Sequence, residues 1–108
     1  MIVCAPITSE KEIDPRWGRA DWVVLAEVVN GEITNWQEVE VGWSKSHDEG
    51  TDGSHHARVV KFLRDNSVGA VVAHHMGDGM LRMLKTMNIP VHLDASGDAR
   101  QAIQSAVE

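Results

Sequence analysis

Hydrophobic residues fall into five short runs separated by polar segments, and these runs predict the strands of a sheet. The run at residues 68–73 is apolar at both odd and even positions, which is typical of a central parallel strand covered on both faces. Asn30 and Gly31 form a strong signal for a two-residue hairpin turn. Pro90 marks its own run as an edge strand because it lacks a backbone donor. The predicted strands are residues 2–5, 22–29, 32–41, 68–73 and 89–93.

Three segments carry apolar residues at helical spacing. The first begins at Ser54 or Asp52, since either side chain could cap the free N–H groups of a helix. The second begins at residues 77–79 and is predicted to stop at Asn88, a residue that tolerates the backbone of a helix end. The third follows Ser96, which we expect to act as its cap.

The order of these elements predicts the fold class. Residues 8–19 and 42–53 are polar and rich in turn-forming residues, so we expect loops there, the second one long. Trp36 has the opposite parity to its apolar neighbours, which predicts a bulge or a partly covered second face. Strands dominate the amino-terminal half, whereas strand and helix alternate in the carboxyl-terminal half. We therefore expect an α/β fold in two or three layers, with a five-stranded mixed sheet and three helices in a single domain over residues 1–108.

The composition excludes several classes of protein. The formal net charge is −6 and the basic residues are scattered, which argues against a nucleic-acid partner. No apolar run approaches the roughly 20 residues of a membrane-spanning helix. Residues 1–6 lack the basic lead and apolar core of a signal peptide, so we expect a cytoplasmic protein. The single cysteine, Cys4, leaves no intramolecular disulfide and no cysteine-based zinc site, and its apolar surroundings predict burial.

Four of the six histidines occur as two pairs at predicted element junctions. His55 and His56 open the first helix, and His74 and His75 follow the strand at residues 68–73. In a parallel α/β sheet these junctions lie side by side at the carboxyl edge, where such folds usually bind ligands. Imidazole suits iron, copper, zinc and nickel. The two pairs therefore predict a metal or metal-cluster site.

Adjacent histidines cannot all converge on one ligand. Neighbours diverge by about 100° on a helix and point to opposite faces on a strand. We therefore expect one member of each pair to lead, His55 together with His74 or His75, while His56 shares a face with apolar residues and is partly buried. His47, in the predicted long loop, could close over a bound ligand.

The surroundings of this edge favour an anionic guest. The helix N-termini near Ser54 and Gly77 should bring partial positive charge and free N–H donors to the same place. Arg16 and Arg19, in the first loop, could assist as cationic lids. This environment opposes an imidazolium and favours a neutral, ligating imidazole or an anion such as a thiometallate cluster.

Several pieces spread over nearly the whole chain also carry a family resemblance. Residues 14–20 are similar to an aspartate-x-arginine-aromatic-glycine-arginine-alanine motif that is followed by a strand. An Asn-Gly hairpin comes next, then His55 at the start of a helix, Met76 and Gly77 at the start of another, and a leucine, isoleucine and valine pattern over residues 84–91. In their order and spacing these pieces resemble the dinitrogenase iron–molybdenum cofactor biosynthesis family, which includes the NifX-like and NifB carboxyl-terminal domains.

The resemblance implies a ribonuclease-H-like fold with the sheet order 3-2-1-4-5, which agrees with Pro90 at an edge. It also implies a non-catalytic role, in which the chain binds or carries a metal–sulfur cluster, or chaperones its transfer between donor and acceptor proteins. Family members usually have small residues in place of His56, His74 and His75, so this chain has either changed its metal preference or gained ligands. The candidate cofactor-binding residues are Arg16, Arg19, Ser54, Met76 and Gly77. The candidate metal ligands are His47, His55, His56, His74 and His75.

Three other functions are compatible with the same residues. A mononuclear zinc or nickel enzyme could use three histidines and an open position, with Asp52 or Asp78 as the base. A protein-interaction domain could use Trp17, Trp36 and Trp43 as contacts, although such tryptophans are more often packing residues. For any of these functions the chain could be a monomer or, through its exposed edge strands, a homodimer. The histidines could also be ordinary caps and surface residues. A two-metal nuclease is excluded because the predicted central strands offer no carboxylates.

Overall fold

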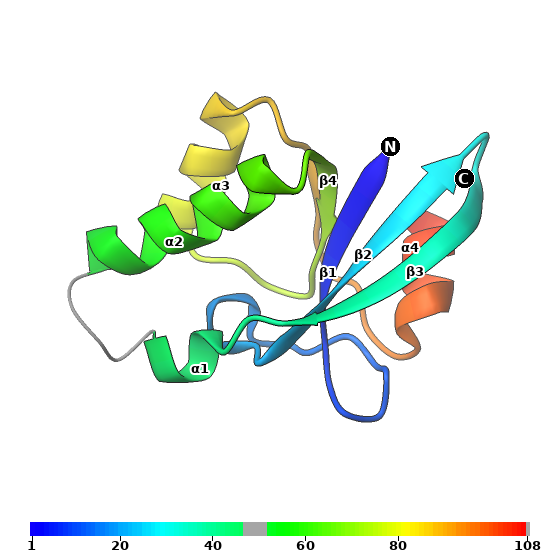
Figure 1. Ribbon diagram of the computed structural model, residues 1–108, viewed down its shortest axis with the longest axis horizontal. Coiled ribbons are helices and arrows are strands. Elements are labelled where there is room, and N and C mark those ends of the chain that lie inside the picture. Colours follow the sequence, from blue (N-terminus) through cyan, green and yellow to red (C-terminus); the bar gives the residue numbers. More distant parts are fainter. Residues whose placement is uncertain (47–51, 108) are drawn as a thin grey trace.

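A computed structural model describes residues 1–46 and 52–107, and Figure 1 shows its elements. A mixed sheet of five strands carries helices on both faces, and a short 3-10 turn follows the first loop. The elements in chain order are β1 (Ile2–Ile7), the 3-10 turn (Trp17–Arg19), β2 (Trp22–Val29), β3 (Glu32–Glu40), α1 (Trp43–Ser46), α2 (Asp52–Asp65), β4 (Val68–Val72), α3 (Asp78–Thr86), β5 (Val91–His92) and α4 (Ala99–Val107).

The strands lie in the order β3-β2-β1-β4-β5, which confirms the predicted sheet. β1 pairs with β2 in antiparallel fashion and with β4 in parallel, while β5 runs parallel to β4. The three parallel strands therefore end at one edge of the sheet, the lower edge in Figure 1. The two crossovers that join them carry the loops and helix starts that meet at that edge.

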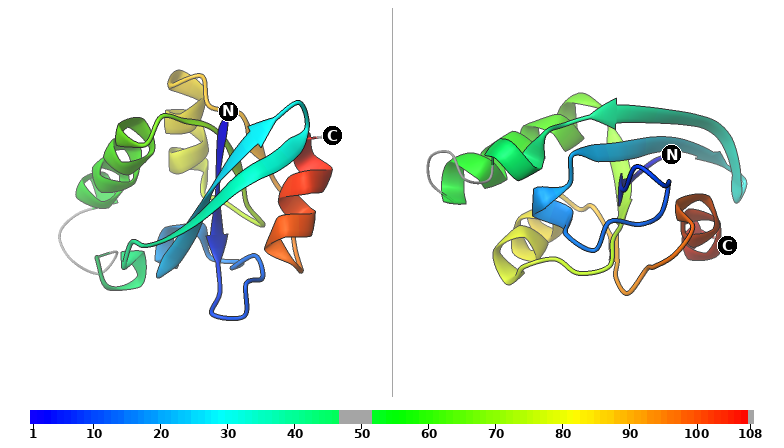
Figure 2. Two further views of the ribbon diagram at one scale, coloured as in Figure 1. Left: turned by 45° about the vertical axis from the view of Figure 1, so that its right-hand side comes forward. Right: turned by 90° about the horizontal axis from the view of Figure 1, so that it is seen from below.

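Alternation along β1 divides the core into two layers. Cys4 faces a cluster built with α2 and α3, in which Leu63 and Leu84 are fully buried. Val3 and Ala5 face the other side, where Ile103 of α4 completes a second cluster. Figure 1 and Figure 2 show the corresponding arrangement, with α2 and α3 on one face of the sheet and α4 on the other. The fold is thus a three-layer α/β/α arrangement.

The hairpin between β2 and β3 confirms the turn signal. Asn30 and Gly31 have φ angles of 52° and 79°, as a type I′ turn requires at both central positions. The pairing slips between Glu27 and Val28, so β3 carries one extra residue and the predicted bulge is present. Trp36 is half-buried on the α4 side of the sheet, where the guanidinium carbon of Arg100 lies 4.5 Å from the centroid of its ring.

The predicted end of α3 is found in the structure, whereas the predicted cap of α4 is not. Asn88 has a φ of 60° just beyond α3, and the amide of Ile89 donates to the carbonyl of Leu84, so the predicted stop at Asn88 is confirmed. The cap of α4 is Asp98, whose carboxylate accepts a 2.9 Å hydrogen bond from the amide of Gln101. The prediction of Ser96 as this cap was wrong because the chain bends through Gly97 before the helix begins.

Two predicted loops contain more structure than their composition suggests. Residues 43–46 form the short helix α1, inside a segment expected to be a loop throughout. Residues 8–19 are tied to the body of the protein by isolated bridges between Ile7 and Ile13 and between Glu12 and Asp98. The last predicted strand is shorter than expected and forms only at Val91–His92. Over the part of the chain that the structure describes, no helix is long and apolar enough to span a membrane.

Candidate functional site

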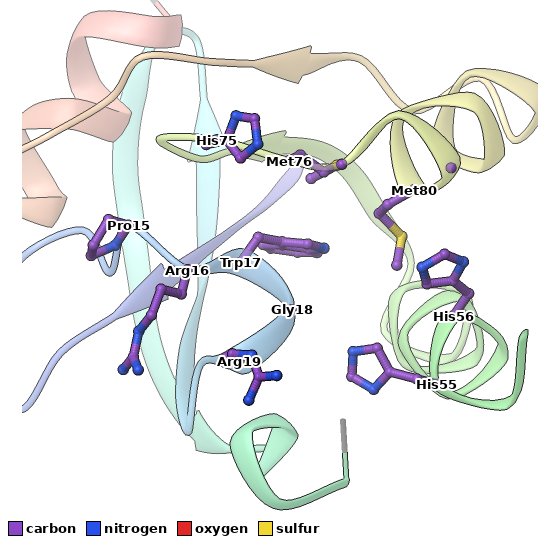
Figure 3. A pocket seen from close by; sticks show the side chains of 12 residues that line it. Pro15, Arg16, Trp17, Gly18, Arg19, His55, His56, His75, Met76 and Met80 are labelled. Atoms are coloured by element: carbon purple, nitrogen blue, oxygen red, sulfur yellow. The ribbon is translucent and has the colours of Figure 1, made fainter. Parts of the chain in front are cut away.

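A pocket of about 400 Å³ opens at the carboxyl edge of the parallel strands. Three separate pieces of the chain form its walls, as Figure 3 shows. Residues 15–19 come from the loop after β1, and His55 and His56 from the first turns of α2. The β4–α3 junction contributes residues 75–77, Gly79 and Met80. The predicted convergence of these junctions at one edge is therefore what the fold produces.

Hydrogen bonds and aromatic packing hold the first wall in place. Asp14 is buried, and its carboxylate accepts a 2.9 Å bond from the amide of Arg16 and a 3.4 Å bond from the Nε of the same residue. This fold of the loop turns Trp17 inward, where only 3% of its surface is exposed. Its ring meets Trp43 edge-on at a centroid distance of 5.1 Å, and Trp43 in turn packs on Phe62 at 5.8 Å. An aromatic cluster therefore anchors the loop that forms this wall of the pocket.

The second wall consists of the histidine pair of α2. His55 is 97% buried, whereas the ring of His56 is half-exposed and crosses to the neighbouring helix α3. A Cβ added to Gly79 would lie 3.2 Å from Cε1 of His56, so the glycine allows this close approach. The two imidazole centroids are 6.3 Å apart.

The third wall contains only one member of the second histidine pair. His75 lines the pocket together with Met76 and Met80, whose side chains are almost fully buried. His74 lies outside the pocket, and its Nδ1 is 3.2 Å from the carbonyl oxygen of Ala95. This split follows from the opposite directions of adjacent side chains at a strand end. Of the two alternatives predicted from the sequence, His75 is therefore the one on the pocket.

The electrostatic character of the pocket is neutral to positive. Arg16 and Arg19 stand on the first wall, and α3 begins at Asp78, after its N-cap Gly77, with its first amides toward the same edge. Among the described residues that line the pocket, none is acidic. Within residues 1–46 and 52–107, no three histidine, cysteine, aspartate or glutamate side chains are grouped closely enough to hold a metal ion. The site as it stands suits an anion with soft or hydrogen-bonding edges better than a bare cation.

The structure brings together most of the predicted site residues. Seven of them line the pocket, namely Arg16, Arg19, His55, His56, His75, Met76 and Gly77. Ser54 is exposed and does not line the pocket, although it stands in the first turn of α2. His47 lies outside the described residues. These placements leave open which of the residues touches a ligand.

Sequence reasoning did not assign Trp17, Gly79 and Met80 to the site, yet all three line it. Trp17 and Trp43 are packing residues of the aromatic cluster, as their residue type favours, and their burial removes both as contacts for a partner protein. Their positions depend on contacts between distant segments, which periodicity does not reveal. The spacing of Met80 from Met76, one helical turn further along the chain, is the signal that could have found it.

Solved structures share this fold at low sequence identity. The crystal structure of PH0822 is 16% identical, with a TM-score of 0.80 over 99% of this chain and 89% of that one. The apo form of the orange protein from Desulfovibrio gigas is 17% identical, with a TM-score of 0.76 over 97% of this chain and 85% of that one. A candidate NifB protein from Thermotoga, solved by NMR, is 19% identical, with a TM-score of 0.70 over the same shares.

A comparison with curated proteins gives no match. A comparison with protein families, in contrast, matches the family described as dinitrogenase iron-molybdenum cofactor over residues 1–108. The match covers every element that builds the pocket, from the loop after β1 to the start of α3. The chain therefore belongs to the dinitrogenase iron-molybdenum cofactor family.

Proposed function

We propose that this protein is a non-catalytic carrier that holds an anionic metal–sulfur cluster in the pocket at the carboxyl edge of the sheet. The cluster is cargo, received from one protein and passed to another. Family membership supports a link to cofactor biosynthesis, and the observation that carries the proposal is the lining of the pocket. Imidazole rings, thioethers and arginines meet there, and none of the described lining residues is acidic.

Each wall would make a different contribution to such cargo. His56 and His75 offer imidazole nitrogens to metal atoms at the periphery of a cluster, and imidazole suits iron, copper, zinc and nickel. Arg19 and the first amides of α3 would offset the negative charge of sulfide ligands. The buried thioether of Met80 adds a soft, polarisable surface.

The mononuclear enzyme is less well supported than the carrier. A catalytic zinc site needs three protein ligands and a nearby general base. The described residues contain no three-ligand group, and Asp78 does not line the pocket. The second candidate base, Asp52, is the first residue of α2.

Elemental analysis of untagged protein purified without oxygen tests the proposal first. We expect stoichiometric iron, molybdenum or copper together with a sulfide charge-transfer band in the visible spectrum. Zinc or nickel alone, in colourless protein, would favour the mononuclear alternative. Protein that takes up neither metal from the cell nor tetrathiomolybdate from solution would contradict the carrier.

A pair of double variants tests the assignment of the histidines. His56→Ala with His75→Ala removes the more accessible imidazoles of the pocket, and we expect at least tenfold weaker retention of the metal at an unchanged helical signal. The matched control is His74→Ala with His92→Ala, which removes two exposed histidines that do not line this pocket. Equal retention by the two double variants would contradict histidine ligation.

A further inference from the structure

The indole nitrogen of Trp17 is buried and has no hydrogen-bond partner among the described residues. Buried polar groups in folded proteins are nearly always paired, and an unpaired one lowers stability, so such an exception calls for a physical reason. Packing does not require this nitrogen, since phenylalanine would also fill an aromatic cluster. An indole nitrogen only donates, and its partner must therefore be an acceptor.

The position of Trp17 indicates where that acceptor would come from. The residue lines the pocket, and Figure 3 shows its ring extending from the 17–19 turn between Met76 and His55, toward Met80. Methionine side chains have three rotatable bonds and repack readily. The indole nitrogen itself is buried, so a guest would reach it through repacking of the pocket wall, to which Met80 belongs. Arg19, on the same turn, adds a cationic side chain to this wall, whereas the Nε of Arg16 is paired with the carboxylate of Asp14.

We propose that the N–H of Trp17 is a specificity-determining donor that binds a sulfide or oxide edge of the anionic cargo. This inference rests on the proposed carrier function and adds a residue and a substrate class to it. The donor is matched to anions, because a bare cation would gain nothing from an N–H group. Trp17 therefore selects anionic clusters over free metal ions at the same pocket.

The test compares Trp17→Phe with Trp43→Phe. Both tryptophans are 3% exposed and belong to one aromatic cluster, but only Trp17 lines the pocket. Tetrathiomolybdate is the anionic probe, and its affinity is measured by optical titration. Trp17→Phe should raise its Kd about tenfold, which corresponds to about 1.4 kcal/mol, whereas Trp43→Phe should change it less than twofold.

A second measurement needs no variant, which matters if Trp17→Phe fails to fold. In protein with ¹⁵N-labelled tryptophan, the indole proton of Trp17 should move downfield when tetrathiomolybdate binds, while that of Trp22 stays in place. Binding by the wild type with equal Kd values for the two variants, or with no shift of the Trp17 proton, would overturn the role of Trp17 and leave the carrier intact. A wild type that binds no tetrathiomolybdate would overturn both.

Discussion

At the residue scale, His56 of α2 and Gly79 of α3 approach each other closely at the pocket. The glycine leaves just enough room for the imidazole, because a Cβ there would be 3.2 Å from Cε1 of His56. Gly79→Ala should therefore displace the ring by a few tenths of an ångström. We expect an intact fold, since alanine favours a helix over glycine by up to about 1 kcal/mol, with severalfold weaker metal retention.

Gly77→Ala is the matched control for this prediction. Gly77 lines the same pocket, has an ordinary φ of −66°, and has nothing within 4 Å of an added Cβ. Thermal unfolding and metal retention measured on both variants separate the two positions. If Gly77→Ala lowers retention as much as Gly79→Ala does, the contact with His56 is not what matters.

Glu38 is a second residue whose environment has a measurable consequence. Hydrogen bonds from Lys11 and from the indole of Trp36 lower the pKa of its carboxyl group, with Lys11 the larger cause. A carboxyl group with a lowered folded pKa adds stability above its unfolded pKa and loses it as the pH falls through the folded value. We therefore expect Glu38→Gln to flatten the loss of stability in urea titrations carried out at progressively lower pH, below the ordinary value of 4.5. Lys11→Ala should flatten it likewise, and acid profiles parallel to the wild type would contradict this linkage.

At the element scale, the end of α3 depends on one left-handed residue. Asn88 has a φ of 60°, where a residue with a Cβ but no polar side chain is strained by roughly 1–2 kcal/mol. Asn88→Ala should lower the free energy of unfolding by about 1 kcal/mol, while Asn88→Gly should leave it equal or higher. Urea unfolding of the two variants gives the comparison. A more stable alanine variant would mean that the helix end rearranges.

The elements themselves could be predicted because their signals are local. The Asn30-Gly31 turn, the doubly apolar run at residues 68–73 and the stop at Asn88 each depend on neighbours in sequence, and each is confirmed. Helix α1 and the 3-10 turn at Trp17–Arg19, with its buried tryptophan, depend instead on packing between distant segments. Both segments are mostly polar, and each has a single buried tryptophan, so the hydrophobic pattern did not predict either element.

The sequence predicts the edge of the sheet at which the pocket lies, but not which member of the second histidine pair faces it. Topology brings the two histidine pairs to one edge, and that follows from the alternation of strand and helix. Which member of the second pair faces the pocket depends on how the chain leaves β4, where the His74 side chain reaches the backbone of Ala95. The alternating direction of side chains along a strand predicts that His74 and His75 point to opposite faces of the sheet. It does not predict on which face the pocket lies.

At the scale of the whole molecule, a negative chain would carry a negative guest. The formal net charge is −6, while the wall of the pocket holds Arg16 and Arg19. At 0.01 M salt the Debye length is about 30 Å, longer than the 12.7 Å radius of gyration of the chain. At this salt concentration the net charge of the whole chain repels an approaching anion. At 0.15 M salt the Debye length is about 8 Å, so the arginines near the pocket determine the potential that the anion meets there.

We therefore expect the association rate of tetrathiomolybdate to rise between these two salt concentrations. Stopped-flow absorbance gives the rate directly. A rate that falls with added salt would mean that the local cations already steer the anion at low ionic strength. Chloride replaced by acetate at equal ionic strength controls for competition by the salt anion itself.

The three-part construction of the pocket also determines when it can be filled. Its lining residues run from Pro15 to Met80, so about three-quarters of the 108-residue polypeptide must emerge and pack before the cavity exists. A nascent chain that stops short of α3 would have no enclosure in which to trap a reactive cluster. Under the proposed carrier function, loading would require the α2 and α3 face to be folded. Local opening of the β4–α3 junction would then release the cargo while α4 and its face of the sheet stay folded.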